Sequence, residues 1–549
     1  MKRIIVYLCL IALILGSCTN PNVEEKTKDH LVENEDYIDL TSKYDGEEFE
    51  YNESLWYMND LKDVPLPDPH VYVENDTYYI VGTSDRDPNV VDCYVTKDFV
   101  NYELHKAIYD PVLYDGWEDK SQALIFAPEV YCIDGVYYMY YSAKDSTLVR
   151  KCSVVAADNP LGPYQPIVND NVNGLDYPLL HNEEYFNRGL DATIFTDDDG
   201  KMYMYFTVTK ATQHIVGVEL ISPYQADWST YKELVIPGTV DSVSEEQFLE
   251  WELYRDNKVK IAEAPFMIKS NGKYYLTYSV NGAYNKYYNV CYAVSDSPLG
   301  NFEKPYQSNG FWSNLLLGYP GTNVKNSTVF NQWTGFASGT GHHCFFNMGD
   351  QVMVGYHAHQ DRDGNGRYEK RYFAFDYLNF DENGVPFCNG PTNSVQPLPE
   401  DLSGYKNIAP FAQVKSENVT NAGAINDNYI VDCYNISGEA EKEVTLGNGY
   451  SFIELTFDQV YEIGGIAIYN SAFFEKILLE IEYIDFGNGN VVNYAQFAYD
   501  QYVDENKEFV FPNSAFTVEF LNTFEADHVV ICVKSDGAAA LNEIVVLGK

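Results

Sequence analysis

The sequence predicts an all-β protein in which a five-bladed β-propeller precedes a β-sandwich. Aromatic residues make up 15% of the 549 residues, with 48 Tyr and 30 Phe, and these residue types favour pleated, half-buried strands. Five times along the chain, a turn rich in Asn, Asp and Gly precedes a strand rich in Tyr or Val. After residue 400 this repeat gives way to short alternating strands. The three observations together indicate two successive β-domains.

The repeat is too long and too uneven for a solenoid. Each unit has the form of a hairpin, as where the turn Ile133–Val136 leads into the strand Tyr137–Ser142. The central residues of the five strands are 59 to 78 positions apart, and they are Tyr79, Tyr138, Tyr203, Tyr275 and Met353. A propeller tolerates such uneven connections because each blade is a sheet of its own. We therefore predict five blades within residues 46–400.

Residues 401–549 predict a separate β-sandwich. Their strands are short and alternate apolar with polar residues, as in Ser451–Phe457, Gly464–Asn470 and His528–Val533. All six Trp residues precede residue 401, so the side chain that stacks best on sugars is missing here. A sugar-binding role and a structural role as a brace against the propeller are both open for this domain.

The charge of the chain limits the class of partner. Lys and Arg number 36 against 81 Asp and Glu, which gives a formal net charge of −45. Such a field repels the nucleic-acid backbone, anionic membrane surfaces and strongly acidic polysaccharides. Apart from Cys9 and Cys18, the cysteines stand singly without metal-ligand spacing, so a zinc site is not expected. We expect a neutral partner and no nucleic acid.

Residues 1–17 have the pattern of an export signal and not of a folded element. Two basic residues precede an apolar run from Ile4 to Leu15, which is too short to span a bilayer. The sequence Leu-Gly-Ser-Cys that ends at Cys18 resembles a bacterial lipobox. The resemblance implies a lipoprotein signal peptide, cleavage before Cys18 and acylation of that residue, with residues 18–45 as a polar tether. We expect an exported protein that meets the cell-envelope membrane only through this lipid anchor.

Acidic residues stand at the start of four of the five predicted blades: Asp68, Glu129, Asp191 and Glu263. We take these positions as equivalent in the repeat. If the first strand of each blade lines the central axis, the four carboxyl groups converge on one cavity. Cleavage of a glycosidic bond needs such a cluster, with a protonated acid at the leaving oxygen and a carboxylate on the opposite side. A third carboxylate can hold the pKa of the acid high by like-charge repulsion. The cluster therefore indicates a glycoside hydrolase.

The stretch from about 63 to 386 resembles glycoside hydrolase family 43. The resemblance is carried by the sequences LPDPH around Asp68, GLDATIF around Asp191 and IAEAPF around Glu263. Members of this family are five-bladed propellers and inverting hydrolases of arabinose- and xylose-containing glycans. The resemblance implies that Asp68 is the general base, that Glu263 is the general acid, and that Asp191 modulates the pKa of the acid and orients the substrate.

Other residues are expected to line the sugar pocket. Phe126 and Glu129 stand where the family often has Trp and Asp, and Ala192 stands where it often has Pro. These departures leave the exact sugar open. Arg371 matches a family Arg that can reach the substrate, although an exposed strand Arg paired with one of the many acids is an equal alternative.

The fifth repeat carries a candidate for a structural metal. The sequence Gly-Thr-Gly-His-His at 339–343 resembles the family's Gly-rich turn with a central His. The resemblance implies that His342, in preference to His343, lies in the axial channel near a bound calcium ion, often through water. A packed, hydrogen-bonded His is the alternative. The segment Asp361–Gly366 looks like half of a calcium loop, but Tyr372 stands at its twelfth position and a polar turn is expected. No cofactor is expected to be required for the reaction.

The C-terminal domain resembles the discoidin-like, galactose-binding-type domains, including family 32 carbohydrate-binding modules. The matching segments are Asn407–Ala412 at its start and Asn542–Gly548 at its end. The resemblance implies a jelly-roll sandwich.

These features predict an inverting hydrolase that releases neutral sugars from plant-type oligo- or polysaccharides. An α-L-arabinofuranosidase is favoured, with a β-xylosidase or a galactofuranosidase of the same fold as the alternative, and with exo or endo action open. A non-catalytic glycan-binding lipoprotein is the alternative from another class. The complete trio of Asp68, Asp191 and Glu263 argues against it, because binding alone does not require all three.

The lipobox makes a prediction about Cys18. In the variant Cys18→Ser the acylated thiol is lost, so we expect the protein to leave the membrane fraction while its activity on a soluble substrate stays the same. Cell fractionation followed by an activity assay checks this. Membrane association that is unchanged in the variant would contradict the assignment.

Overall fold

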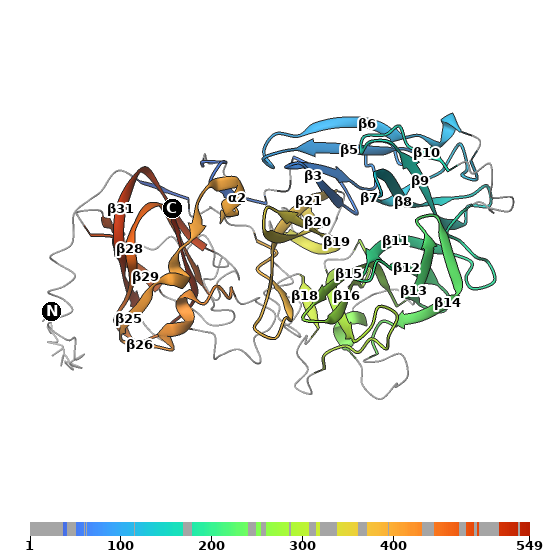
Figure 1. Cartoon of the computed structure of the whole chain (residues 1–549). Coiled ribbons are helices and arrows are strands. Elements are labelled where there is room, and N and C mark those ends of the chain that lie inside the picture. Colours follow the sequence, from blue (N-terminus) through green and yellow to red (C-terminus); the bar gives the residue numbers. More distant parts are fainter. Residues whose placement is uncertain are drawn as a thin grey trace, which may run out of the picture.

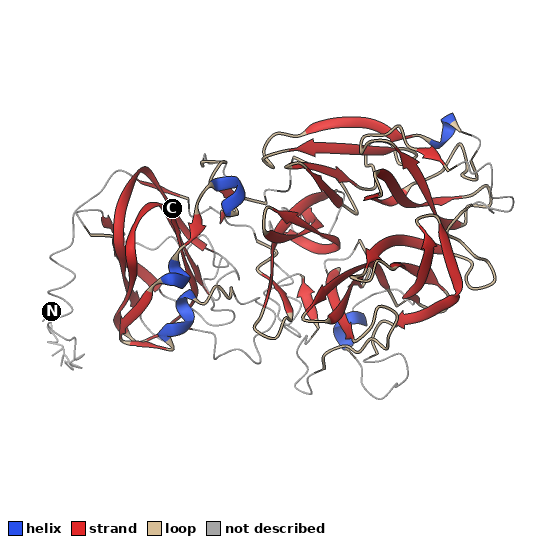
Figure 2. Ribbon diagram, in the orientation of Figure 1, coloured by secondary structure: helices blue, strands red, loops and turns tan. Residues whose placement is uncertain are grey.

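The computed structural model contains five small sheets around an axis and a separate sheet domain (Figures 1 and 2). The predicted signal peptide, Cys18 and the segment 361–366 lie outside the residues that it describes. No helix within the described residues is long and apolar enough to cross a membrane. The described residues are 37–40, 51–59, 61, 63–114, 116–167, 178–239, 249–253, 260–284, 287–306, 314–318, 337–360, 370–392, 395–430, 444–470, 479–487, 491–493, 515–535 and 539–549.

Each of the five sheets is an antiparallel blade of four strands in sequence order, which confirms the predicted five-bladed propeller. Blade 1 consists of β3 (His70–Glu74), β4 (Thr77–Val81), β5 (Val91–Thr96) and β6 (Glu103–Tyr109), and blade 2 of β7 (Phe126–Ile133), β8 (Val136–Lys144), β9 (Arg150–Ala157) and β10 (Gln165–Pro166). Blade 3 consists of β11 (Gly189–Thr196), β12 (Met202–Thr209), β13 (Gln213–Ser222) and β14 (Gln225–Val235), and blade 4 of β15 (Ala262–Ser270), β16 (Lys273–Val280), β17 (Asn289–Ser295) and β18 (Leu315–Leu317). Blade 5 consists of β19 (Ala337–Met348), β20 (Gln351–Gln360), β21 (Arg371–Phe380) and β22 (Pro386–Cys388).

The turn residues account for the hairpins between the first two strands of the blades. In the pairs Asn75-Asp76, Asp134-Gly135 and Asn271-Gly272, both residues have positive φ. This is the backbone of the type I′ turn, whose twist matches that of the flanking strands and which favours Asn, Asp and Gly. The first strands β3, β7, β11, β15 and β19 then contact one another in a closed ring around the axis.

Each blade has one non-Gly residue in the left-handed conformation, either within its first strand or just before it. These residues have φ between 45° and 56°, and they are Asp68, Ala127, Asp191, Ala264 and His342. In blades 2 to 5 this residue lies in a shift of the strand register. Such a shift redirects the side chains on either side of it. When the blades are aligned on their left-handed residues, only Asp68 and Asp191 occupy the same position. Glu263 lies directly before the left-handed residue of its blade, and Glu129 lies two residues after that of its own blade. The expectation of four equivalent acids was therefore wrong.

The C-terminal domain is one continuous sheet of ten strands, with the order β26-β27-β32-β28-β31-β29-β30 and with β1, β24 and β25 attached at its sides. Two very long strands curve through it (Figure 1). Its strands are β24 (Lys406–Asn407), β25 (Gln413–Glu417), β26 (Val419–Thr420), β27 (Val444–Leu446), β28 (Gly449–Asn470), β29 (Leu479–Asp485), β30 (Val491–Asn493), β31 (Ala515–Ser535) and β32 (Ala539–Gly548). Short helices are η1 (Pro111–Leu113), η2 (Glu250–Leu253), α2 (Glu400–Ser403), η4 (Ala409–Phe411) and η5 (Ala422–Asn426).

The segments Ser451–Phe457 and Gly464–Asn470, expected as separate strands, both belong to β28. Their pairing explains the difference. The first half of β28 pairs with β25, and its second half pairs with β32, with a register shift between Thr456 and Tyr461. One strand thus takes part in two layers, as is usual where a sandwich is built from bent strands.

The N-terminal segment joins the two domains. Tyr37–Asp39, which the sequence placed in a polar tether, form β1 and pair with β31 of the C-terminal sheet. Trp56–Tyr57 form β2 and pair with β23, Gln396–Pro397. The side chain of Trp56 is fully buried in an apolar cluster that includes Leu547 of β32. A Cβ atom at Gly465 would lie 2.5 Å from the Trp56 ring, so that position needs Gly.

The sequence left the pairing of the cysteines open. All seven cysteines in the described part of the chain are free thiols, and six of them are buried: Cys93, Cys152, Cys291, Cys344, Cys388 and Cys532, with Cys132 exposed. Burial raises the pKa of the Cys291 thiol, which makes it a small apolar group in the core of its blade.

The junction between the domains makes a stability prediction. Trp56→Ala removes a fully buried aromatic side chain, and such changes cost about 3–5 kcal/mol of unfolding free energy. We expect a clearly lower unfolding temperature by calorimetry, whereas the control Leu521→Ala, at a side chain that is 56% exposed, should change it little. An unfolding temperature that is the same in both variants would show that Trp56 does not join the domains.

Candidate active site

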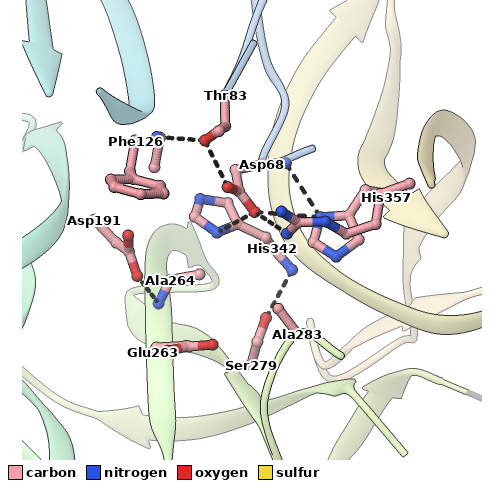
Figure 3. A network of polar contacts seen from close by, with 12 residues as sticks. Asp68, Thr83, Phe126, Asp191, Glu263, Ala264, Ser279, Ala283, His342 and His357 are labelled. Atoms are coloured by element: carbon pink, nitrogen blue, oxygen red, sulfur yellow. Dashed lines mark hydrogen bonds and ion pairs between the residues drawn. The ribbon is translucent and has the colours of Figure 1, made fainter. Parts of the chain in front are cut away.

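Three of the predicted acids come together from the first strands of blades 1, 3 and 4 or the residues just before them. Figure 3 shows Asp68, Asp191 and Glu263 facing a common space. Asp191 Oδ2 accepts a hydrogen bond of 3.2 Å from the backbone N–H of Ala264, the residue after Glu263. The charges of Glu263 and Asp68 both raise the pKa of Asp191, after the larger effect of its burial. Blades 1, 3 and 4 therefore each supply one carboxyl group to the same site.

The carboxylate of Asp68 is held by groups from two blades. Arg371 Nη1 of blade 5 donates to Asp68 Oδ1 at 2.8 Å, and Thr83 Oγ1 of blade 1 donates to Oδ2 at 2.6 Å. His342 Nδ1 lies 3.3 Å from Oδ1. The backbone N–H of Asp68 donates to His357 Nδ1 at 3.1 Å (Figure 3), so that nitrogen carries no proton. Arg371 is thus the partner of the buried carboxylate of Asp68 and not of a surface acid.

Glu263 is only half-buried and lies beside polar groups of other strands. Gln213 Nε2 donates to Glu263 Oε2 at 3.2 Å. The fully buried ring of Tyr288 stacks on His357, with 5.5 Å between ring centroids. Burial, followed by the charges of Glu263 and the other two acids, raises the pKa of Tyr288. A Cβ atom at Gly341 would lie 2.4 Å from that ring, so only Gly leaves room for Tyr288.

An aromatic ring and a cation lie on the side of Asp191. The guanidinium carbon of Arg150 is 3.8 Å from the centre of the Phe126 ring, a cation–π contact. The charge of Arg150 lowers the pKa of Asp191, against the larger effects of burial and of the neighbouring acids. Phe126 is half-buried and faces the site (Figure 3). Phe126, which the sequence predicts to line the sugar pocket, therefore lies near Asp191, and Arg150 is a neighbour that the sequence did not indicate.

A family model described as glycosyl hydrolases family 43 matches residues 57–386, which is more than half of the chain. The chain belongs to this family. Curated relatives include a β-D-galactofuranosidase of Aspergillus niger, 29% identical over 35% of this chain and 46% of that protein, and a β-xylosidase of Xylanibacter ruminicola, 32% identical over 31% and 52%. A xylosidase/arabinosidase of Bacteroides ovatus is 26% identical over 43% of this chain and 76% of that protein. The chain thus spans about half the length of the first two relatives.

Solved structures of the same family align with the propeller. A thermostable family-43 glycoside hydrolase is 26% identical, with a TM-score of 0.48, over 62% of this chain and 99% of that one. An α-L-arabinofuranosidase from Lactobacillus brevis is 21% identical, with a TM-score of 0.44, over 60% and 95%. The family assignment rests on the sequence match of residues 57–386.

The family 43 site holds its acids in opposite electrostatic environments. Burial raises the pKa of Asp68, but Arg371, His342, His357 and the Thr83 hydroxyl together outweigh burial and hold this pKa well below its ordinary value. The pKa of Asp191 is raised well above its ordinary value, by burial first and by Glu263 next. Asp68 is therefore ionised at neutral pH, whereas the protonated form of Asp191 is favoured.

Glu129 is not arranged like the other three acids. Tyr131 donates to Glu129 Oε2 at 2.5 Å, and the Tyr131 hydroxyl also lies 2.9 Å from Thr193 Oγ1. Burial raises the pKa of Glu129 to about 8, against the lowering effect of these hydroxyls. Because it lies two residues beyond the left-handed Ala127, Glu129 is bonded into the wall between blades 2 and 3. The structure thus gives Glu129 hydrogen-bond partners in this wall, and its expected position in the sugar pocket stays a prediction.

The residues around His342 do not form a direct calcium site, and the expected contact with calcium through water stays a prediction. Calcium takes six to eight oxygen ligands, whereas imidazole suits softer metals. His342 faces one carboxylate, that of Asp68, which already binds Arg371. Within the described residues, no group of three or more His, Cys, Asp or Glu side chains could hold a metal. His342 is a buried, hydrogen-bonded His whose backbone N–H donates to Ser279 Oγ at 2.8 Å. His343 instead contacts Thr277 Oγ1 at 2.6 Å.

The Thr83 hydroxyl makes a prediction about pH dependence. Thr83→Val removes a donor to the ionised form of Asp68, so the pKa of Asp68 rises and Asp68 takes up a proton at a higher pH than in the wild type. A hydrogen bond to a charged group is worth about 1.5–3 kcal/mol, which corresponds to about 1–2 pH units. We expect the acidic limb of kcat/KM to move upward by that amount, as measured by pH–rate profiles. Thr83→Ser, which keeps the hydroxyl, should restore the wild-type limb, and a limb that does not move in Thr83→Val would refute the role of this bond.

Proposed function

We propose that this family 43 enzyme is an inverting hydrolase of neutral glycans, with α-L-arabinofuranosidase activity as the favoured specificity. The observation that carries the proposal is the meeting of three carboxyl groups from three blades, in which the pKa of Asp68 is lowered and the pKa of Asp191 is raised beside Glu263. This supports the division of roles that inversion requires, with a base on one side of the sugar and an acid on the other.

In the proposed reaction, Asp68 accepts a proton from a water molecule as the water oxygen attacks the anomeric carbon. Glu263 donates its proton to the glycosidic oxygen, and the bond between that oxygen and the anomeric carbon breaks. Asp191 lies beside Glu263, and its charge opposes ionisation of the acid until the leaving group takes the proton. One water is consumed, and one free sugar and one shortened glycan are formed.

The substrate is proposed from charge and from the relatives together. With a net charge of −45, the enzyme favours a neutral sugar. The relatives are a galactofuranosidase, a β-xylosidase and a xylosidase/arabinosidase, so β-xylosidase and galactofuranosidase activities are the second candidates. Hydrolysis of nitrophenyl α-L-arabinofuranoside, β-D-xyloside and β-D-galactofuranoside tests the three. Binding of these sugars without hydrolysis of any would favour a non-catalytic glycan-binding protein.

The roles of acid and base predict different losses on two kinds of substrate. Glu263→Gln removes the proton that a sugar leaving group needs, so the rate on a natural oligosaccharide should fall by about 10²–10⁴-fold. The rate on an aryl glycoside should fall less, because a phenolate leaves with little help. Asp68→Asn removes the activation of water, so both substrates should suffer alike. Steady-state kinetics of both variants provides the measurement.

The control for this comparison is Asp198→Asn, at a side chain that is 87% exposed and pairs with Lys269. It should leave both rates unchanged. Equal losses of Glu263→Gln on both substrates, or a fully active Asp68→Asn, would show that the roles are assigned incorrectly.

The stereochemistry of the product is a separate prediction. In an inverting enzyme, a water must fit between the base and the sugar, so the carboxyl groups of Asp68 and Glu263 should lie roughly 6.5–9.5 Å apart. The first sugar released should then have the opposite anomeric configuration to the substrate. Proton NMR during the first minutes of hydrolysis checks this, before mutarotation mixes the anomers. Retention of configuration would exclude the proposed mechanism.

A further inference from the structure

Asp68 has one further partner, which binds its backbone and not its carboxylate. The backbone N–H of Asp68 donates to Nδ1 of His357 at 3.1 Å (Figure 3). Asp68 Oδ1 lies 3.5 Å from the same nitrogen, beyond the usual length of about 2.7–3.2 Å for an N–H···O bond. Because a backbone N–H can only donate, Nδ1 of His357 is the acceptor. The mechanism proposed above gives this bond no role.

The polar contacts of the His357 imidazole explain why a His stands at this position. The side chain is fully buried, and burial, followed by the charge of Arg371, lowers its pKa. The ring is therefore neutral, with its proton on Nε2. Within the described part of the chain, Nε2 has no hydrogen-bond partner, and a buried donor without a partner lowers stability. An apolar side chain would thus suit packing better, and the bond to Asp68 is what requires the imidazole.

The acceptor nitrogen is held in place by the packing of the ring. His357 lies within β20 and pairs with Gly341 of β19 and Phe373 of β21. The ring of Tyr288 stacks on the imidazole, with 15° between the two planes. A Cβ atom at Gly341 would overlap the ring of Tyr288, so the backbone there leaves room for the stack. Nδ1 is therefore fixed before a substrate arrives.

The bond to His357 completes the fixation of one peptide unit. The carbonyl oxygen of Pro67 accepts from the backbone N–H of Thr83 at 2.9 Å. The N–H of Asp68, on the other side of the same peptide bond, is held by His357. Two residues later β3 begins at His70 and pairs with β4. Because the chain is fixed on both sides of Asp68, its φ angle is fixed as well, and this angle sets the direction of the Cα–Cβ bond.

The φ angle that is fixed in this way is an uncommon one. It is 55°, in the left-handed region, which residues other than Gly occupy only where the surroundings enforce it. A change of φ toward the extended region would turn the carboxylate away from Arg371 and Thr83, its two hydrogen-bond donors. A general base must lie within hydrogen-bond reach of the water from which it takes a proton. The aim of Asp68 therefore depends on its backbone as well as on its side-chain partners.

We propose that His357 is the positioning residue of the base. As a neutral hydrogen-bond acceptor, it holds the left-handed backbone of Asp68 and so directs the carboxylate at the attacking water. His357 acts through Asp68 and does not contact the sugar. The proposal deepens the proposed function and rests on it, since it assumes that Asp68 is the base of a hydrolase.

The experiment removes the acceptor at position 357 and then restores it. The Leu of His357→Leu branches at the same carbon as His but cannot accept a hydrogen bond, whereas the Asn of His357→Asn places Oδ1 where Nδ1 stands. A misplaced base slows the chemical step and leaves the sugar contacts intact, so His357→Leu should lower kcat by about 10²-fold with little change in KM. His357→Asn should recover most of this loss. The matched control is His343→Leu, at another buried His of blade 5 whose hydrogen bond goes to Thr277, and its kcat should stay close to that of the wild type.

Steady-state kinetics on a nitrophenyl glycoside gives both constants, and cleavage by the wild type tests the proposed function by itself. A wild-type kcat in His357→Leu, a loss in His357→Asn as large as that in His357→Leu, or an equal loss in His343→Leu would overturn the role of His357. A thermal melt shows whether each variant is folded. If His357→Leu does not fold, His357→Phe, which keeps a ring against Tyr288, takes its place.

If the wild type cleaves no substrate, crystal structures of His357→Leu and His357→Asn decide the matter. An Asp68 that keeps its left-handed φ angle and its bond to Arg371 in His357→Asn, but not in His357→Leu, supports the positioning role. The same geometry of Asp68 in both variants overturns it.

Discussion

The buried charge of Asp68 is the constraint on which the rest of the site depends. A carboxylate that is removed from water reverts to its neutral form unless cations and hydrogen-bond donors compensate for the lost hydration. At Asp68 the main compensation comes from the hydrogen-bonded Arg371, with His342 3.3 Å away; both belong to blade 5, whereas Asp68 itself opens blade 1. The interaction that keeps this carboxylate ionised is therefore also a contact between the first and last blades. The same contact therefore helps to close the ring and to keep the Asp68 carboxylate ionised.

The backbone of the inner strands is the second constraint, and much of it could be predicted from the sequence. Hairpin turns such as Asn271-Gly272 carry the type I′ signal directly, and they located the blades. The different positions of the acids relative to the left-handed residue could also be seen in the sequence. Aligning Ala127-Pro128 with Ala264-Pro265 and Asp68-Pro69 places the left-handed residues of these three blades at one position. Asp tolerates that conformation better than most residues, which is consistent with its presence there in blades 1 and 3.

Other parts of the site could not be predicted, because their partners are distant in the sequence. Arg371 is 303 residues from Asp68, and Tyr288 and Arg150 come from loops or outer strands with no local motif. Nothing in the local sequence marks Thr83, and only its hydrogen bond to Asp68 identifies it as a residue of the site. The long strand β28 was missed for a related reason. One neighbour of β28 changes from β25 to β32 along its length, and the register against β31 shifts between Thr456 and Tyr461. The local sequence pattern that results is the same as that of two short strands.

Opposite pKa directions within one small site follow from the placement of two arginines. Arg371 bonds directly to Asp68 and overcomes its burial, whereas Arg150 only partly offsets the burial of Asp191 and the charge of Glu263. Arg150 is in turn positioned over the ring of Phe126. The ring that lines the sugar pocket thus also positions the cation that acts on Asp191. A substitution at Phe126 would therefore move the Arg150 guanidinium and raise the pKa of Asp191, and if Phe126 contacts the sugar as proposed, it would change sugar specificity and pH dependence together.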